Sequence, residues 1–190
     1  YYSCLDGNWN ADGDSIYGEG YFSLANPGDD CDLLPDVYVG RAATTTLLQA
    51  QRFVNRVFQY SRTPVGDYET SLLCFAEVLF PQDWDLGMFI TLDGAELIEE
   101  LLPTFSGHPE FHIARLYENY TEPSYTPGAL PLTKAIVLDS LDRGYNLVVH
   151  VGHGYRNTMV IGDESLDNGD ALGLTNGNRL TNLYAINCTS

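Results

Sequence analysis

The chain has 190 residues, of which 44% are hydrophobic and 12% aromatic, so it can bury one substantial core and does not resemble a disordered segment. Nine Lys and Arg against 26 Asp and Glu give a formal charge of −17, which repels phosphate backbones and anionic lipid surfaces and favours divalent cations. Nucleic acid is therefore excluded as an expected partner. Membrane insertion is not expected either, because no apolar run approaches the roughly 20 residues needed to cross a bilayer.

An acidic loop rich in Gly, Asp and Asn occupies residues 6–32. Within it, residues 8–19 read N-W-N-A-D-G-D-S-I-Y-G-E and fit the calcium-loop pattern, although no helix pattern flanks them as in an EF-hand. We expect structural calcium here, and an Asx-rich turn without metal is the alternative. The expected ligands are Asn8, Asn10, Asp12, Asp14 through its carbonyl oxygen, and Glu19.

After this loop, apolar periodicity and capping residues predict alternating strands and helices. The expected elements are a short strand at 36–40, an amphipathic helix after 44–46, a buried strand at 71–79, a helix capped by Asp93, a strand at 111–117, a helix at 132–141 that ends at Gly144, a buried strand at 147–151 and a strand at 183–187. Residues 155–181 are too polar for a long helix, and we expect a loop there with a small hairpin around 159–161. Strands that alternate with helices imply parallel pairing through right-handed crossovers, hence a three-layer α/β sandwich.

Two of the predicted strands end in residues with reactive side chains. The first ends in H-V-G-H-G at residues 150–154, and the last leads into Cys188. Because ligand crevices in such sheets lie beyond the carboxyl ends of the strands, His153 and Cys188 should lie at the same edge. An imidazole near a thiol can take its proton or stabilise the thiolate, and the amides of Gly154 and Cys188 could face a developing oxyanion.

The other cysteines and the neighbouring histidine have simpler interpretations. Cys74 lies in an apolar run and is expected in the core. Cys4 and Cys31 flank an acidic loop region and could form a disulfide if the protein is exported, but the sequence does not establish that they meet. A histidine at a strand end can also be a hydrogen-bonded structural residue. A metal pair of His150 and His153 is disfavoured because residues i and i+3 of a strand point to opposite faces.

These features resemble the catalytic domain of the gingipain-type (C25) cysteine peptidases, of the caspase-like group (clan CD). The matching residues are P-D-V-Y-V-G-R at 35–41 with the amphipathic helix after it, the strand that ends in H-V-G-H-G, and the strand that ends in I-N-C at 186–188. The order of these three elements, with His153 and Cys188 35 positions apart, is more specific than any one of them.

The resemblance implies a caspase-like αβα sandwich with a mostly parallel central sheet over residues 1–190, and a cysteine endopeptidase that acts on protein or peptide substrates. His153 would be the general acid or base, Cys188 the nucleophile, and His150 a packing residue. An acidic residue that assists the histidine would fall nearest to Glu77. An acidic residue of the specificity pocket would come from the region of Asp83, Asp85 and Asp93.

The end of the chain departs from the family pattern, because only Thr189 and Ser190 follow Cys188, where the family continues with a helix and a strand. We therefore expect a piece that is incomplete at its C-terminus and also short at its N-terminus, or a chain cleaved near the active site. The expected setting is secreted or at the surface of a bacterium. The alternative function is a catalytically inactive, calcium-stabilised binding module with the same fold.

Overall fold

The computed structural model describes residues 7–20, 28–29, 31, 34, 36–37, 39–40, 42–62, 65–66, 68–80 and 92–188. The chain divides into two compact units, Tyr1–Phe53 and Val54–Ser190. The predicted strand at 36–40 is wrong for its described residues, which are bends and coil. Val37 and Val39 are 40% and 52% exposed there, so no burial offsets the cost of ordering an extended segment.

Helices and strands alternate through the second unit. The helical elements are α1 (Leu47–Arg62), α2 (Gly94–Leu101), η1 (Leu102–Phe105), η2 (Pro123–Tyr125), α3 (Lys134–Arg143) and α4 (Asn168–Gly173). The strands are β1 (Ser71–Ala76), β2 (Val78–Phe80), β3 (Leu92–Asp93), β4 (His112–Tyr117), β5 (Ala129–Pro131), β6 (Leu147–Val151), β7 (Gly154–Tyr155), β8 (Thr158–Ile161), β9 (Glu164–Asp167) and β10 (Asn182–Ile186).

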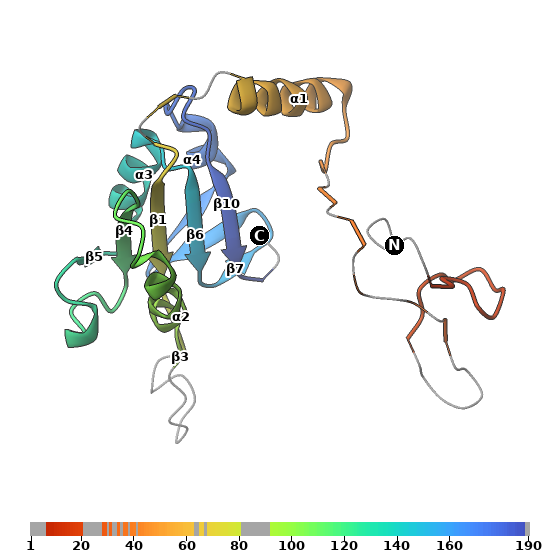
Figure 1. Cartoon of the computed structure of the whole chain (residues 1–190), viewed down its shortest axis with the longest axis horizontal. Coiled ribbons are helices and arrows are strands. Elements are labelled where there is room, and N and C mark those ends of the chain that lie inside the picture. The colour runs from red at the N-terminus through yellow and green to blue at the C-terminus, as the bar shows by residue number, and fades with distance from the viewer. Residues whose placement is uncertain are drawn as a thin grey trace. The chain divides into compact units, whose positions relative to one another are not determined.

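A five-stranded sheet in the order β10-β6-β1-β4-β5 organises this unit, and every neighbouring pair is parallel. Figure 1 shows β4, β1, β6 and β10 side by side, with the C-terminus next to β10. The predicted α/β architecture with a parallel central sheet is therefore confirmed. The connection from β6 to β10 holds the antiparallel sheet β7-β8-β9, which confirms the hairpin expected around 159–161.

Each face of the sheet is covered by its own apolar core, which makes the sandwich three layers deep. The alternating residues Leu72, Cys74 and Ala76 of β1 pack with Ala95 and Ile98 of α2. Leu73 and Phe75 point to the other face, where they pack with Val137 of α3 and with the β8–β9 hairpin. Burial on both faces explains why these strands read as continuous apolar runs.

Local signals in the sequence set the helix boundaries. The Asp93 carboxylate accepts the N–H of Ala95 at 3.0 Å and caps α2, as predicted. The Thr133 hydroxyl caps α3, and Gly144 ends it with its N–H bonded to the Leu141 carbonyl. The predicted strand at 71–79 is interrupted at Glu77, which separates β1 from β2.

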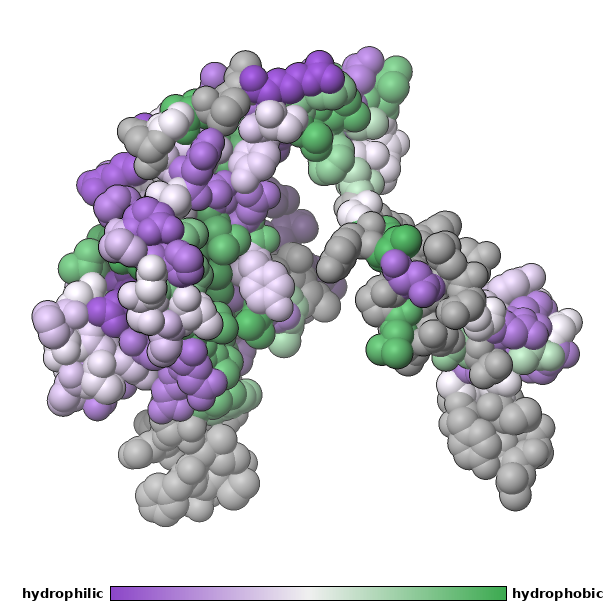
Figure 2. All heavy atoms as spheres, viewed as in Figure 1, coloured by the Kyte–Doolittle hydropathy of each residue, from purple (hydrophilic) through white to green (hydrophobic). Residues whose placement is uncertain are grey.

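The predicted amphipathic helix is α1, and its leucine, valine and phenylalanine side chains remain between 45% and 75% exposed. Figure 2 shows green, hydrophobic side chains grouped on this helix. They are Leu47, Leu48, Phe53, Val54, Val57 and Phe58. Among the described residues, no helix combines the length and apolar character that a membrane span requires.

Gly94 lies where α2 begins against the sheet, and a Cβ there would lie 2.9 Å from the Glu77 carbonyl oxygen and 2.9 Å from Val151 Cγ1. We predict that Gly94→Ala lowers the free energy of unfolding by about 1–3 kcal/mol, because both neighbours are fixed in the sheet. Chemical denaturation measures the change. Gly107→Ala is the matched control, since nothing lies within 4 Å of its Cβ position, and equal stability of the two variants would contradict the close packing.

Candidate functional site

Four parallel strands end at one edge of the sheet, and each leads into a residue with a polar or reactive side chain. Three of these residues were singled out from the sequence, and one was not. They are Glu77 after β1, His153 after β6, Cys188 after β10 and, unforeseen, Glu118 after β4.

His153 and Cys188 follow strands that are direct neighbours. Val151 pairs with Ile186, and the Gly152 N–H donates to the Ile186 carbonyl at 3.1 Å. The described ladder ends at this pair, and His153 and Cys188 each follow two residues later, at the same edge of two neighbouring strands. Cys188 is exposed, whereas Cys74 is buried in the core as predicted. Burial raises the pKa of the Cys74 thiol to about 12.

The His153 ring contacts a backbone carbonyl. Its Nε2 lies 2.9 Å from the Leu79 carbonyl oxygen, and the ring meets the Phe80 ring edge to face at 5.8 Å. A carbonyl oxygen only accepts hydrogen bonds, so Nε2 donates in this contact, and an imidazole with one ring proton then has its acceptor lone pair on Nδ1. Nothing in the sequence pointed to Leu79, because its role depends on its backbone carbonyl.

Glu77 lies at the site but contacts the backbone of His153. Its carboxylate accepts the His153 N–H at 2.6 Å and the Gly162 N–H at 2.7 Å, and the residue is only 3% exposed. Burial raises the pKa of the Glu77 carboxyl, and the two N–H donors offset part of that rise. Glu77 therefore joins the segment after β6 to the turn between β8 and β9.

Gly154 begins β7, where it pairs with Met159 of β8. The neighbouring pair is hydrogen-bonded, since the Val160 N–H donates to the His153 carbonyl at 2.9 Å. Hydrogen-bonded and non-hydrogen-bonded pairs alternate in antiparallel strands, so the Gly154 N–H points away from β8. This orientation is compatible with the predicted oxyanion role.

The other acidic residues near this edge have structural partners. The Glu118 carboxylate accepts the Val78 N–H at 2.8 Å. Asp93 caps α2, and its buried carboxylate also accepts a hydrogen bond from the Tyr125 hydroxyl at 3.0 Å. Both contacts give Asp93 a structural role. Asp83 and Asp85 lie outside the described residues, so their assignment to a specificity pocket stays a prediction.

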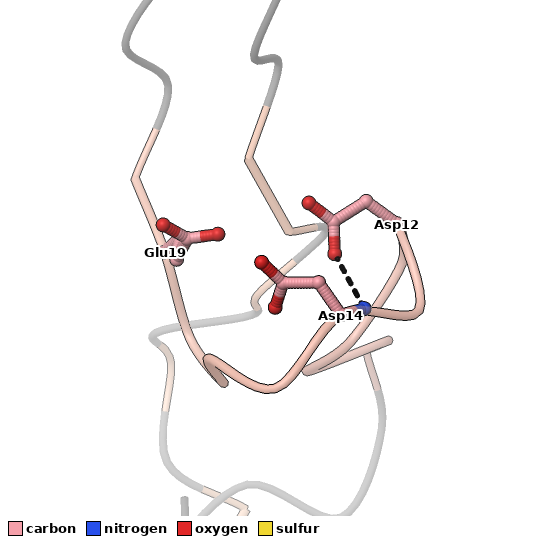
Figure 3. A group of neighbouring side chains, drawn as sticks. All are labelled: Asp12, Asp14 and Glu19. Atoms are coloured by element: carbon pink, nitrogen blue, oxygen red, sulfur yellow. Dashed lines mark hydrogen bonds between the residues drawn. The ribbon is translucent and has the colours of Figure 1, made fainter.

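In the first unit, the predicted calcium loop brings Asp12, Asp14 and Glu19 together (Figure 3). One carboxylate oxygen from each lies within 4.8 Å of the others. Two oxygens that bind one calcium ion at about 2.4 Å can be at most about 4.8 Å apart, so the spacing suits this cation. Asp14 contributes its carboxylate to the group, whereas its carbonyl, the predicted ligand, accepts the Asn10 side-chain N–H at 3.2 Å.

The remaining predicted ligands are the two asparagines. Asn8 Oδ1 accepts the Asn10 N–H at 3.2 Å, an Asx turn of the kind the metal-free alternative predicts. The Asn10 side-chain oxygen is buried and accepts no hydrogen bond from the described residues. A buried acceptor without a donor is costly unless a cation or water contacts it, so Asn10 fits a ligand role.

Charge and backbone bonds also shape the loop. Loss of solvation, followed by the charges of Asp14 and Asp12, raises the pKa of the Glu19 carboxyl. Asp29, which the sequence analysis missed, accepts the N–H groups of Ala11 at 2.6 Å and Gly18 at 2.7 Å. Loss of solvation raises the pKa of Asp29, but these and further N–H donors outweigh it and lower the pKa. The Cys4–Cys31 disulfide stays a prediction, because Cys4 lies outside the described residues.

Comparison with solved structures supports the fold. The complex of Porphyromonas gingivalis RgpB pro- and mature domains matches with a TM-score of 0.56 and 19% identity, over 81% of this chain and 33% of that chain. The Arg-specific cysteine proteinase gingipain R (RgpB) matches with a TM-score of 0.57 and 19% identity, over 82% and 32% of the two chains. This chain thus spans about a third of these structures.

Comparison with curated proteins gives no significant match. The family model for peptidase family C25, in contrast, matches residues 1–190. Because that match covers the whole sequence, the chain belongs to peptidase family C25, a family of cysteine peptidases.

Proposed function

We propose that this chain carries the catalytic dyad of a cysteine endopeptidase, with Cys188 as nucleophile and His153 as general acid and base. The observation that supports this most is the parallel pairing of β6 with β10, because His153 and Cys188 follow these two neighbouring strands at the same edge of the sheet. The Leu79 carbonyl on Nε2 supports the role of Nδ1 as the proton acceptor.

The reaction follows from this arrangement. His153 Nδ1 takes the Cys188 thiol proton, and the sulfur attacks the scissile carbonyl carbon to form a C–S bond. The oxyanion forms at the edge where the N–H of Gly154 points away from β8. His153 then gives its proton to the amide nitrogen as the C–N bond breaks, and water, deprotonated by His153, hydrolyses the thioester and releases the thiol.

We also propose that the loop at 8–19 binds calcium as a structural ion, held by Asp12, Asp14 and Glu19 together with Asn10. The carboxylate spacing and the buried Asn10 oxygen support this fit. The ion would neutralise clustered negative charge and fix the loop. Protein or peptide substrates and a secreted or cell-surface setting in a bacterium are part of the same proposal, since extracellular calcium modules work at about 0.1–1 mM calcium.

Alkylation tests the dyad in the full-length protein. We predict that iodoacetamide labels Cys188 at least about 10-fold faster than the buried Cys74 near neutral pH, and that His153→Ala sharply slows the labelling of Cys188 itself, because the thiolate loses its partner. Mass spectrometry of tryptic peptides reports each cysteine separately. His108→Ala, at an exposed histidine, is the control. Equal labelling of Cys188 and Cys74 would refute the mechanism.

A fluorogenic peptide panel on the same protein separates the peptidase from the catalytically inactive binding module. Hydrolysis that is lost in Cys188→Ala supports the peptidase. An absence of hydrolysis, with Cys188 still labelled rapidly, would favour the inactive module instead.

Glu77→Gln tests whether this carboxylate acts on the backbone. The amide NH₂ would face the N–H of His153 or Gly162, so we predict a loss of about 1–3 kcal/mol in stability and a clear fall in kcat. Thermal unfolding and peptide hydrolysis measure the two effects, with the exposed Glu100→Gln as control. A shifted pH profile with unchanged stability would instead indicate that Glu77 acts on the imidazole, as the sequence first suggested.

Calcium removal tests the loop. We predict that the melting temperature is higher in millimolar calcium than in a chelator. At a calcium concentration 100 times the Kd, binding would stabilise the folded state by about 2.7 kcal/mol. Glu19→Gln should reduce the shift, while Glu122→Gln, an exposed residue outside the loop, should keep it. An unchanged melting temperature in calcium would contradict the proposed calcium site.

A further inference from the structure

His150 is buried in β6, three residues before His153. It is 0% exposed and lies against Phe75 with ring centroids 4.8 Å apart. It was expected only to pack, and this contact agrees with that role. Both of its ring nitrogens, however, also have polar partners.

The two partners require one specific form of the ring. Nε2 lies 3.2 Å from the Val160 carbonyl, which only accepts, so Nε2–H donates. Nδ1 then accepts from the Asn187 side-chain NH₂ at 3.3 Å. Rotating the Asn187 amide would place an oxygen against Nδ1 and require a charged imidazolium. Burial lowers the pKa of His150 to about 4, so the ring is neutral near pH 7 and this second arrangement is disfavoured.

These two bonds join both halves of the proposed site. Val160 is the residue whose N–H donates to the His153 carbonyl at 2.9 Å. Asn187 directly precedes Cys188 and follows β10, which pairs with β6. The bond from Asn187 to His150 therefore constrains the residue next to the proposed nucleophile.

Gly152 shows how closely this region is packed. A Cβ on Gly152 would lie 2.6 Å from Glu77 Oε2 and still closer to His150 Nε2. The His150 ring and the Glu77 carboxylate thus both approach the backbone between the two histidines. Their positions are coupled to the same short segment.

We propose that His150 is a positioning residue, which holds the Asn187 side chain and thereby fixes the backbone that presents Cys188 to His153. This inference rests on the proposed function, because it concerns the placement of that nucleophile. It goes beyond the dyad by assigning the buried histidine and Asn187 to one hydrogen-bonded unit that does not touch the substrate.

Two substitutions at His150 separate positioning from packing in the full-length protein. His150→Asn keeps a side-chain oxygen near the place of Nδ1 and can accept from Asn187, whereas His150→Gln keeps an N–H near the place of Nε2 and loses that acceptor. We expect His150→Gln to lower kcat and the Cys188 alkylation rate by about 10-fold or more, with KM little changed, because small misplacements of reacting groups are costly. His150→Asn should stay within about 3-fold of wild type, as should the control His112→Gln at an exposed histidine.

Asn187→Ala provides a second route that leaves the core intact. It should reproduce the loss seen in His150→Gln, and the double variant should lose no more than either single variant, because both remove the same bond. Additive losses would overturn the proposal. Equal losses in His150→Gln and His150→Asn that follow the melting temperature would also overturn it, since packing alone would then account for them.

Nitrogen NMR of the imidazole gives a readout independent of catalysis. We expect His150 to carry its proton on Nε2 at pH 7, and the Nδ1 resonance to shift in Asn187→Ala. An Nδ1–H tautomer, or no shift, would refute the hydrogen-bonded unit. If wild-type Cys188 is labelled no faster than Cys74, the proposed function fails, while the NMR result still decides the His150–Asn187 contact.

Discussion

The parallel pairing of β6 with β10 is the constraint on which the rest of the site depends. His153 and Cys188 are 35 positions apart in the sequence, and the ladder from Leu147–Asn182 to Val151–Ile186 brings them to the same edge of the sheet, each after one of two neighbouring strands. Parallel strands need a crossover, and here the connection is the β7–β9 hairpin region with α4. The same connection supplies Gly154, Val160 and Gly162 to the site, so the crossover is itself part of the site.

Buried polar groups hold this edge together. Both carboxylate oxygens of Glu77 accept hydrogen bonds from backbone N–H groups, and both ring nitrogens of His150 contact polar partners. Each side chain is nearly inaccessible to solvent, so leaving one of its polar atoms without a hydrogen bond would destabilise the fold by more than a formed hydrogen bond stabilises it. A polar network of this kind fixes one geometry, which is what a nucleophile and base in neighbouring strands require.

Clustered negative charge is the main feature of the loop in the first unit. A formal charge of −17 over 190 residues favours cation binding, and in the loop the carboxylates of Asp12, Asp14 and Glu19 approach one another. Asp29 satisfies the backbone of the loop from outside the cluster. The loop backbone thus has partners within the chain, whereas the described residues place three carboxylates together and no hydrogen-bond donor on the buried Asn10 oxygen, which is the basis for proposing an ion.

The sequence by itself determined the parallel α/β class, the buried strands β1 and β6, the Asp93 cap of α2, the end of α3 at Gly144, and the common edge of His153 and Cys188, because apolar runs and capping residues act locally. The tertiary structure decided the partners. Glu77 binds the amide of His153 rather than its ring, the Leu79 carbonyl orients that ring, and His150 contacts Asn187. These contacts join residues 37 to 76 positions apart, and their distances arise only when the strands pair. The expected strand at 36–40 failed for a related reason, because strand propensity stabilises little without a partner strand and burial.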